Sequence, residues 1–292
     1  MALLASEAIW ASVMSFTIET ATLAGRLKEP DLLILDGTTN VLPHGLQPCR
    51  AEFERGHIPG AQFVDIDGDW SDPDHAGGLH FMLPPSEHFA AAVRRLGIAP
   101  DTFVVCYATG NHWWASRLWW TLRVFGHNNV AVLDGGFQRW TAEGRPVETG
   151  PGRSRTEGQF EARFRPELVA SRQDVLAAIG DGGVCTVNAL RPEQHRGDVA
   201  SASGRSGHIA GSINIPALRL VDEDNRFRPA AELRRLLAEP LSKPRVITYC
   251  GGGVAASSPT LLLTMLGHPD VRLYDASLAE WACDESLPMA LG

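Results

Sequence analysis

Several features that would place this chain in a special class are missing from its 292 residues. No run is long and apolar enough for a membrane helix, which needs about 20 such residues. The five cysteines are an odd number without tight pairs, so they indicate a reducing compartment rather than a disulfide framework. A net charge of -8 argues against a nucleic-acid surface. These absences predict a cytoplasmic protein with no nucleic-acid and no membrane partner.

Marks of a cofactor or of a secretory signal are also missing. The ten histidines show no zinc-ligand spacing, so we expect neither a metal nor an organic cofactor. The first residues carry Glu7 and lack a basic segment followed by a strong apolar one. Met14 is an alternative start to Met1, and an intact peptide containing Ala2 in the native protein would rule it out.

What is present is organised around residues 245–268, which read R-V-I-T-Y-C-G-G-G-V-A-A-S-S-P-T-L-L-L-T-M-L-G-H. β-Branched and aromatic residues predict a buried strand that ends just before Cys250. Three glycines then predict a tightly curled loop, because glycine adopts conformations closed to other residues. A helix is expected over residues 255–266, with Pro259 in its first turn and Gly267 as its stop.

A cysteine between a strand and a helix has a particular chemistry. Backbone N–H groups of a tight loop and a helix N-terminus both stabilise an anion, here a thiolate or a persulfide. The alternative is a small buried cysteine in a glycine turn. Ligands bind at the carboxyl ends of strands in open α/β sheets, which favours the functional interpretation. The predicted loop groups are Gly251, Gly252, Gly253, Val254, Ala255 and Ala256.

An internal repeat sets the domain organisation. The paired positions are His127 and His268, Trp140 and Trp281, and Asp134 and Asp275, each 141 residues apart (268 − 127 = 141). A G-H-I motif also recurs, at His57 and His208. Two copies of one domain fit this pattern better than a solenoid of many short repeats. Aligning the copies places Ala108 where Cys250 stands, so the first copy lacks the nucleophile.

Within each copy, strands alternate with helices. In the first copy strands are expected to end at Asp36, Tyr107 and Asp134, with helices over 20–27, 85–96 and 115–125 and a long loop over 65–83. In the second, Ser171 and Asp174 form a capping-box start, and a helix is expected over 230–237. This alternation predicts an α/β fold of two domains, each a parallel sheet flanked by helices. The expected boundaries are 1–150, a linker at 151–165, and 166–292.

The motifs Y-C-G-G-G-V-A-A-S, L-G-H and Y-D-A-S-L-A-E-W follow one another in the second copy. Together they resemble the active half of the tandem-domain rhodaneses, the thiosulfate and 3-mercaptopyruvate sulfurtransferases, over residues 16–291. The resemblance implies an inactive N-terminal domain and a sulfurtransferase with Cys250 as nucleophile. Its persulfide would pass sulfur from the donor to cyanide, a small thiol or a protein thiol.

The chain departs from the family pattern at several positions. Asn188, Leu190 and Gln194 stand where the family typically has an Asp-x-Arg start and a second arginine. Gly251 and Gly252 replace the arginine and lysine of thiosulfate-specific members, and Gly252 replaces the serine of mercaptopyruvate-specific ones. With an uncharged loop, the donor's counter-charge must come from elsewhere.

Arg191 is the predicted donor-binding cation, because it lies just past the first strand of the active copy, at the sheet edge where the Cys250 loop is expected. The alternative is a solvated surface arginine. In that case the search moves to Arg196 or to the loop with Asp65, Asp67 and His80.

For several other residues that could be functional, a structural role is expected or is the alternative. Cys106 and Cys185 lie within predicted strands and are expected to pack in the core. His57 and His208 occur in both copies, which favours a turn-fixing role. The Trp113–Trp114 and Trp119–Trp120 pairs are expected in the core or between the domains. Asp275 and Ser277 have either a role beside the Cys250 loop or a role in a turn.

Two rival functions remain. A cysteine phosphatase on a similar fold needs a longer loop closed by an arginine that grips phosphate, whereas Ala256 stands six residues after Cys250. A non-catalytic module that binds a partner or senses sulfide is the alternative from another class.

Overall fold

The computed structural model describes residues 16–42, 45–75, 77–201 and 203–292. The alternative start at Met14 lies outside these residues. No helix among the described residues is both long enough and apolar enough to cross a membrane.

Five parallel strands form the sheet of the first copy, in the order β1-β7-β6-β2-β5. The strands are β1 (Thr17–Ile18), β2 (Leu32–Asp36), β5 (Ala61–Phe63), β6 (Phe103–Tyr107) and β7 (Val130–Leu133). The helices are α2 (Thr20–Arg26), α3 (Arg50–Arg55), α4 (Ile66–Asp69), α5 (Ser86–Arg95), α6 (Trp113–Val124) and α7 (Gly136–Ala142). Almost every residue of β2, β6 and β7 is buried, as expected for a parallel sheet covered on both faces.

The second copy repeats this plan with the sheet order β11-β9-β12-β13-β8, again all parallel. Its strands are β8 (Val169–Ala170), β9 (Val184–Asn188), β11 (Ile213–Asn214), β12 (Arg245–Tyr249) and β13 (Val271–Tyr274). Its helices are η2 (Pro166–Leu168), α8 (Arg172–Ala178), α9 (Pro192–Arg196), η3 (Ala217–Leu220), α10 (Ala230–Leu236), α11 (Ala238–Leu241), α12 (Ser257–Met265) and α13 (Ser277–Trp281). The predicted α/β class and the two parallel sheets are therefore confirmed.

Two short antiparallel pairs supplement the sheets: β3 (Thr39–Leu42) with β4 (Gly45–Pro48), and β10 (His208–Ile209) with β14 (Met289–Ala290). The structure tests three local predictions. The capping box of Ser171 and Asp174 is present, and Pro259 lies in the first turn of α12. The loop expected over 65–83 is wrong in part, because it contains α4, whose N-cap Asp65 accepts a hydrogen bond from the Gly68 N–H.

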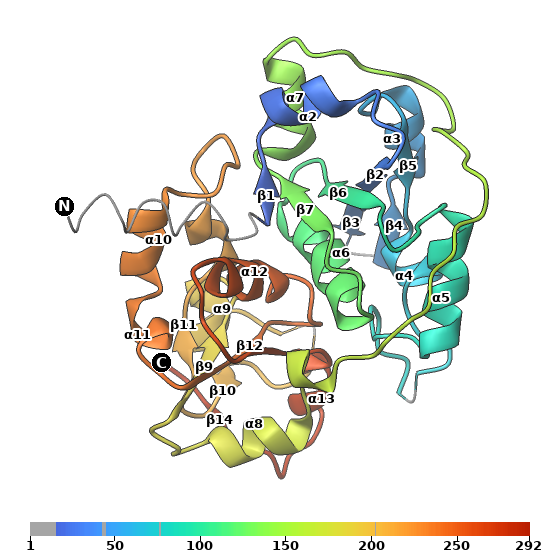
Figure 1. Cartoon of the computed structure of the whole chain (residues 1–292). Helices are drawn as coiled ribbons and strands as arrows, with labels where there is room; N and C mark the ends of the chain where they lie inside the picture. Colours follow the sequence, from blue (N-terminus) through green and yellow to red (C-terminus); the bar gives the residue numbers. More distant parts are fainter. Residues whose placement is uncertain (1–15, 43–44, 76, 202) are drawn as a thin grey trace, which may run out of the picture.

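The two copies share one hydrophobic core. Along β6, alternate residues Val104 and Cys106 face a cluster that includes α6 side chains and continues into α12 side chains of the second copy. Figure 1 shows α6 (green) and α12 (dark red) side by side between the two sheets. Small residues allow this close approach: Ser258 Oγ donates to Ser116 Oγ at 3.3 Å.

The copies also exchange hydrogen bonds in a nearly reciprocal manner. Asp275 Oδ2 accepts from the Leu83 N–H at 2.8 Å, and its counterpart in the repeat, Asp134, accepts through Oδ1 from the Phe227 N–H at 2.7 Å. In each copy the aspartate that follows the matching strand, β7 or β13, thus accepts a backbone N–H from a loop of the other copy. Residues 151–165 contain no helix or strand and run back along the first copy, where the Arg163 N–H donates to the Phe125 carbonyl oxygen.

Candidate active site

Cys250 follows the last residue of β12, the middle strand of the second sheet, and its relative exposure is 2%. The next residues form a loop that leads into α12 without regular structure before Ser257. The predicted strand, loop and helix are therefore all present, although the helix begins at Ser257 rather than at residue 255.

The loop keeps most of its backbone donors free. Among the described residues, no hydrogen-bond acceptor pairs with the N–H groups of Gly251, Gly252, Val254, Ala255 or Ala256. Unpaired N–H groups in a tight loop form an anion-binding nest. The Gly253 N–H is not part of it, because it donates to Ser277 Oγ at 3.1 Å.

The three glycines differ in what they require. Gly253 has φ of +75°, and a Cβ there would lie 2.5 Å from the Asp275 carbonyl oxygen. Gly251 and Gly252 have no positive φ, and a Cβ at either position would meet open space. The expectation that all three glycines shape the curl is thus wrong for Gly251 and Gly252, which other residues could replace without backbone strain.

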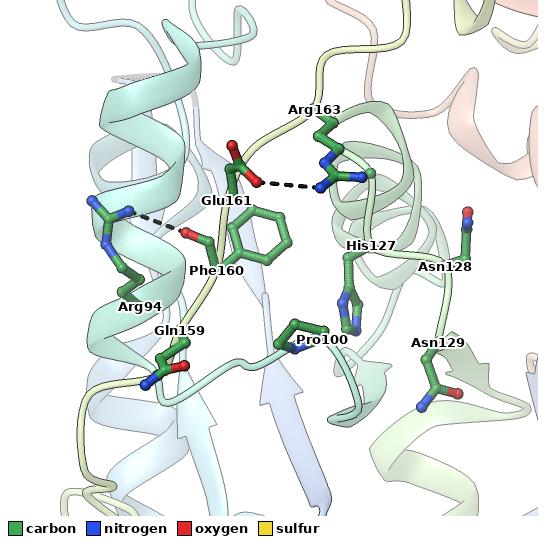
Figure 2. Close-up of a pocket in the computed structure, with 11 residues that line it drawn as sticks. Arg94, Pro100, His127, Asn128, Asn129, Gln159, Phe160, Glu161 and Arg163 are labelled. Carbon is green, nitrogen blue, oxygen red and sulfur yellow. Dashed lines mark hydrogen bonds and ion pairs between the residues drawn. The ribbon is translucent and has the colours of Figure 1, made fainter.

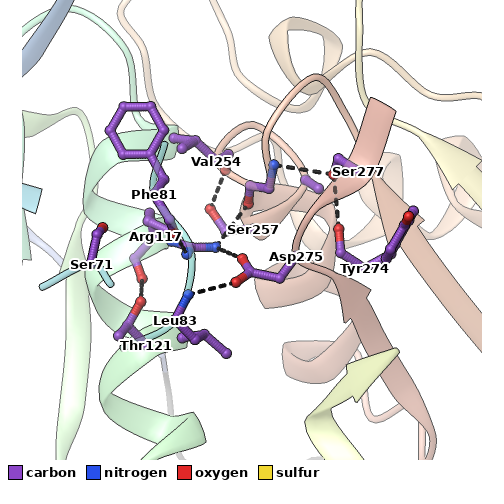
Figure 3. A network of polar contacts seen from close by, with 12 residues as sticks. Ser71, Phe81, Leu83, Arg117, Thr121, Val254, Ser257, Tyr274, Asp275 and Ser277 are labelled. Atoms are coloured by element: carbon purple, nitrogen blue, oxygen red, sulfur yellow. Dashed lines mark hydrogen bonds and ion pairs between the residues drawn. The ribbon is translucent and has the colours of Figure 1, made fainter. Parts of the chain in front are cut away.

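Ser277 anchors the Cys250 loop through hydrogen bonds. Its Oγ accepts from the N–H groups of Cys250 and Gly253, both at 3.1 Å, and donates to the Tyr274 carbonyl oxygen (Figure 3). Ser277 holds φ of 51°, which is uncommon for a residue other than glycine. Of the two interpretations left open for Asp275 and Ser277, the role beside the Cys250 loop is therefore the one that the contacts support.

Cys250 lines a cleft of about 540 Å³ between the two copies. The second copy supplies Leu190, Arg191, Gln194, Pro216, Ala217, Leu218, Cys250, Gly251, Gly252, Val254 and Ala255, and the first copy supplies Phe81, Asn111, Trp113 and Trp114. A mostly apolar cleft with a few polar groups at a domain interface is typical of a small-molecule site. Gly253 and Ala256, which were predicted to bind substrate, are not among its lining residues.

Arg191 is brought to this cleft, as predicted. It is the N-cap of α9, and 57% of its side chain is exposed. Its Nε lies 3.2 Å from Glu193 Oε1 and 3.3 Å from Gln194 Oε1. Leu190 and Gln194, two of the departures from the rhodanese pattern, also line the cleft, whereas Asn188 is buried and accepts from the Leu190 N–H.

The residues named as alternatives to Arg191 do not line the cleft. Arg196 pairs with Asp198 at 2.6 Å. Asp67 joins His80 at 2.8 Å and accepts from the Phe81 N–H at 2.9 Å, so this pair supports Phe81, which does line the cleft. Asp65 caps α4.

The first copy lacks both the thiol and a serine at the position of Ser277. Ala108 is buried, and the Thr109 N–H donates to Thr38 Oγ1 at 2.9 Å instead of remaining free. At the position of Ser277 stands Gly136, with a similar φ of 59° but no hydroxyl. The two loops share one contact, since the Leu278 N–H donates to the Cys250 carbonyl oxygen as the Phe137 N–H does to that of Ala108. Their backbones differ, because the positive φ falls at Gly110 in the first loop and at Gly253 in the second.

Ala108→Cys is therefore expected not to create a second site of equal activity. The loop around the new thiol would lack the anchoring serine, and its Thr109 N–H would still donate to Thr38 Oγ1. Sulfur loading of both cysteines, located by peptide mass mapping after incubation with thiosulfate, is the measurement. Equal labelling of positions 108 and 250 would contradict the prediction.

The remaining cysteines and the repeated histidines have structural surroundings. Cys106 and Cys185 are buried in strands, as predicted, and burial raises the pKa of Cys185 to about 12. Cys49 is also buried, whereas Cys283 is exposed. His57 and His208 each place Nδ1 2.8 Å from a carbonyl oxygen, that of Phe53 and that of His195, as a turn-fixing role requires.

A second cavity, of about 650 Å³, lies between α5 and the linker in the first copy (Figure 2). Its charged groups are largely engaged with the protein itself: Arg94 donates to the Phe160 carbonyl oxygen, and Arg163 pairs with Glu161. Cys250 is not among its lining residues. The smaller cleft, which Cys250 lines, is therefore the candidate active site.

Sequence reasoning missed Arg117 and Phe81 as parts of the site. Arg117 is 1% exposed, and its guanidinium reaches Asp275 Oδ1 at 2.6 Å across the interface. The available signal was an arginine near the middle of a mostly apolar helix, which indicates a buried charge that needs a partner.

Two tandem parallel α/β domains, with one loop-cradled cysteine at the carboxyl end of a central strand, define the class of this protein. A family model described as the rhodanese-like domain matches residues 20–143 and 172–283. The chain belongs to the rhodanese-like family and contains two copies of the domain.

Individual relatives agree with this assignment. The 3-mercaptopyruvate sulfurtransferase of Escherichia coli K12 is 34% identical over 272 residues, covering 91% of this chain and 95% of the relative. The thiosulfate sulfurtransferase of Gallus gallus is 34% identical over 270 residues, covering 90% of each. The crystal structure of the 3-mercaptopyruvate sulfotransferase SseA from Escherichia coli matches with a TM-score of 0.79 at 34% identity, over 90% of this chain and 99% of that one.

Proposed function

We propose that this protein is a sulfurtransferase that moves sulfane sulfur from thiosulfate or 3-mercaptopyruvate to a thiophilic acceptor through a persulfide on Cys250. Relatives named for either donor support the sulfurtransferase class. The observation that carries the mechanism is Cys250 at the end of β12, on the cleft wall, followed by five loop N–H groups without a partner among the described residues.

The proposed reaction is a double displacement. The Cys250 thiolate attacks the terminal sulfur of thiosulfate, breaking its S–S bond, or the thiol sulfur of 3-mercaptopyruvate, breaking its C–S bond. Thiosulfate then leaves as sulfite, and 3-mercaptopyruvate leaves as pyruvate after its carbon takes up a proton. An acceptor such as cyanide or a thiol, including a protein thiol, attacks the outer sulfur of the persulfide and returns Cys250 to the thiolate.

The loop stabilises charge during both steps. The negative sulfur is held by the free N–H groups, which are already oriented and need no rearrangement as charge moves between the two sulfurs. Gly251, Gly252, Val254 and Ala255 line the cleft together with Cys250, which supports this role. Ala256, at the start of α12, adds the helix N-terminus behind them.

The two copies divide the work in this proposal. Residues 1–150 form the inactive copy, with Ala108 at the nucleophile position, 151–165 the linker, and 166–292 the catalytic copy. The inactive copy supplies one wall of the cleft, through Phe81, Trp113 and Trp114.

The test is to incubate the purified protein with thiosulfate and, separately, with 3-mercaptopyruvate. We expect a mass gain of one sulfur on the peptide containing Cys250, lost on addition of cyanide, and rates with the two donors measured side by side identify the preferred one. No mass gain with either donor would favour the alternative, a non-catalytic rhodanese module.

Arg191→Ala is expected to raise KM for an anionic donor, with less effect on kcat if the contact is equal in the ground and transition states. A charge-assisted contact contributes about 1.5–3 kcal/mol, which corresponds to a roughly ten- to hundredfold change. Because more than half of the Arg191 side chain is exposed, solvent screening places the expectation near the lower end, about tenfold.

Arg196→Ala is the matched control, because Arg196 belongs to the same helix and is also paired with a carboxylate, but it does not line the cleft. Its KM should stay at the parent value. An unchanged KM for both donors in Arg191→Ala would instead make Arg191 a solvated surface residue.

A further inference from the structure

Arg117 belongs to the copy that lacks the nucleophile, yet its side chain ends against the Cys250 loop. Its Nη1 donates to Asp275 Oδ1 at 2.6 Å and, at 3.4 Å, to the Gly253 carbonyl oxygen. Its Nη2 donates to the Phe81 carbonyl oxygen. Figure 3 shows the guanidinium between the loop with Phe81 and Leu83 on one side and Asp275 on the other.

The contact of Arg117 with the Gly253 carbonyl oxygen fixes the direction of the Val254 N–H group. That carbonyl and the Val254 N–H belong to the same trans peptide, in which the two groups point in opposite directions. Holding the carbonyl against Arg117 therefore turns the Val254 N–H away from Arg117. Val254 shares the cleft wall with Cys250, and its N–H is one of the free donors of the loop.

The same contact makes the Val254 N–H a stronger hydrogen-bond donor. A cation on the carbonyl oxygen polarises the peptide, and hydrogen bonds in series reinforce one another in a low-dielectric interior. Arg117 is 1% exposed, so its charge is weakly screened by solvent. Asp275 fixes the guanidinium, and the Leu83 N–H fixes Asp275 in turn.

We propose that Arg117 of the inactive copy is a positioning residue that orients and polarises the Gly253–Val254 peptide, so that the Val254 N–H stabilises the anionic sulfur on Cys250. This inference rests on the proposed function for its consequence in turnover. Its effect on the thiolate can be measured without any sulfur donor. Docking of the first copy is thereby a condition for a competent loop in the second.

The experiment must separate positioning from stability. Arg117→Met leaves Asp275 buried with its charge unpaired, and this variant is expected to be strongly destabilised. Arg117→Met combined with Asp275→Asn removes both charges, and Arg117→Lys keeps the charge but lacks the planar fork that serves three acceptors. Both of these variants should fold, as denaturant unfolding will show.

Two readouts are then compared with the parent. The first is the rate of Cys250 alkylation by iodoacetamide at fixed pH, located by peptide mapping with the exposed Cys283 as internal reference. We expect alkylation about three- to tenfold slower, because the thiolate is the reacting species and its lower population outweighs its gain in nucleophilicity. The second is sulfur transfer, where kcat should fall at least about tenfold, with a smaller change in KM.

Arg123→Met is the control. Arg123 also lies on α6 and packs over the rings of Phe16 and Trp119, away from the Cys250 loop. Its loss should lower stability without slowing alkylation or transfer.

A purely structural role predicts a different result. A loop loosened only by lost packing would expose Cys250 and speed its alkylation. Parental or faster alkylation, or an unchanged kcat, in either folded variant overturns the proposal. If the parent forms no persulfide with either donor, the proposed function fails, and the alkylation rates still decide the role of Arg117.

Discussion

Cys250→Ser is expected to abolish sulfur transfer, with kcat lower by at least about 10⁴-fold, as when the nucleophile of a double-displacement enzyme is removed. A serine hydroxyl is hardly ionised near neutral pH, and it cannot form a persulfide. The fold should survive, because the first copy places the buried Ala108 at the matching position of its own loop. Turnover with thiosulfate and 3-mercaptopyruvate, together with denaturant unfolding, measures the two effects.

Cys185→Ser is a useful companion, because Cys185 is a buried cysteine of the same copy that does not line the cleft. It should lose stability while each folded molecule keeps the parental kcat. A cyanide-labile mass gain of one sulfur in Cys250→Ser would show that another group carries the sulfur.

Gly253→Ala is expected to have the second-largest effect, on both stability and activity. A residue other than glycine at φ of +75° costs about 1–3 kcal/mol. The new Cβ would also meet the Asp275 carbonyl oxygen at 2.5 Å, Asp275 Oδ1 at 2.8 Å and Arg117 Nη1 at 3.0 Å, all groups with little room to move. We therefore expect a loss of about 2–4 kcal/mol in the free energy of unfolding, and a kcat at least about tenfold lower from the displaced loop.

Gly252→Ala is the matched control one residue away. Its Cβ would point into open space, and its backbone has no positive φ, so its unfolding free energy should stay within about 0.5 kcal/mol of the parent. Equal destabilisation by the two substitutions would show that the loop does not depend on the left-handed conformation of Gly253.

This difference also bears on the choice of donor. Gly251 and Gly252 line the cleft and leave room for a side chain, and they occupy the positions where other rhodaneses carry charged or hydroxyl residues. Because no backbone strain opposes a side chain there, we expect donor preference to be adjustable at these two positions while Gly253 keeps the loop in shape.

Much of the architecture was predictable from local patterns. Apolar strands alternating with helices, repeated with an offset of 141 residues (281 − 140 = 141), predicted two parallel α/β domains. The loss of the thiol at Ala108 predicted which copy is active. The strand, cysteine, glycine loop and helix from Arg245 onward predicted where the nucleophile lies. These features are local because a strand or helix must present its own apolar residues to a core.

Other features were decided by tertiary structure. The sequence of G-G-G does not distinguish Gly253 from its neighbours, because its left-handed φ and its close approach to Asp275 and Arg117 exist only in the folded protein. A lone serine after an aspartate does not reveal that Ser277 Oγ accepts from two loop N–H groups. The short helix α4 was missed because its four residues, Ile-Asp-Gly-Asp, have no period to detect.

By itself, the sequence determined the fold class, the repeat and the candidate nucleophile, since each is encoded in the residue patterns of short segments of the chain. The docking of the two copies decided the rest of the site. The Arg117–Asp275 contact joins residues 158 positions apart, and Trp113 and Trp114 at the start of α6 reach the Cys250 cleft because α6 packs against α12. Such contacts depend on how two finished surfaces fit together, and no local pattern records that fit.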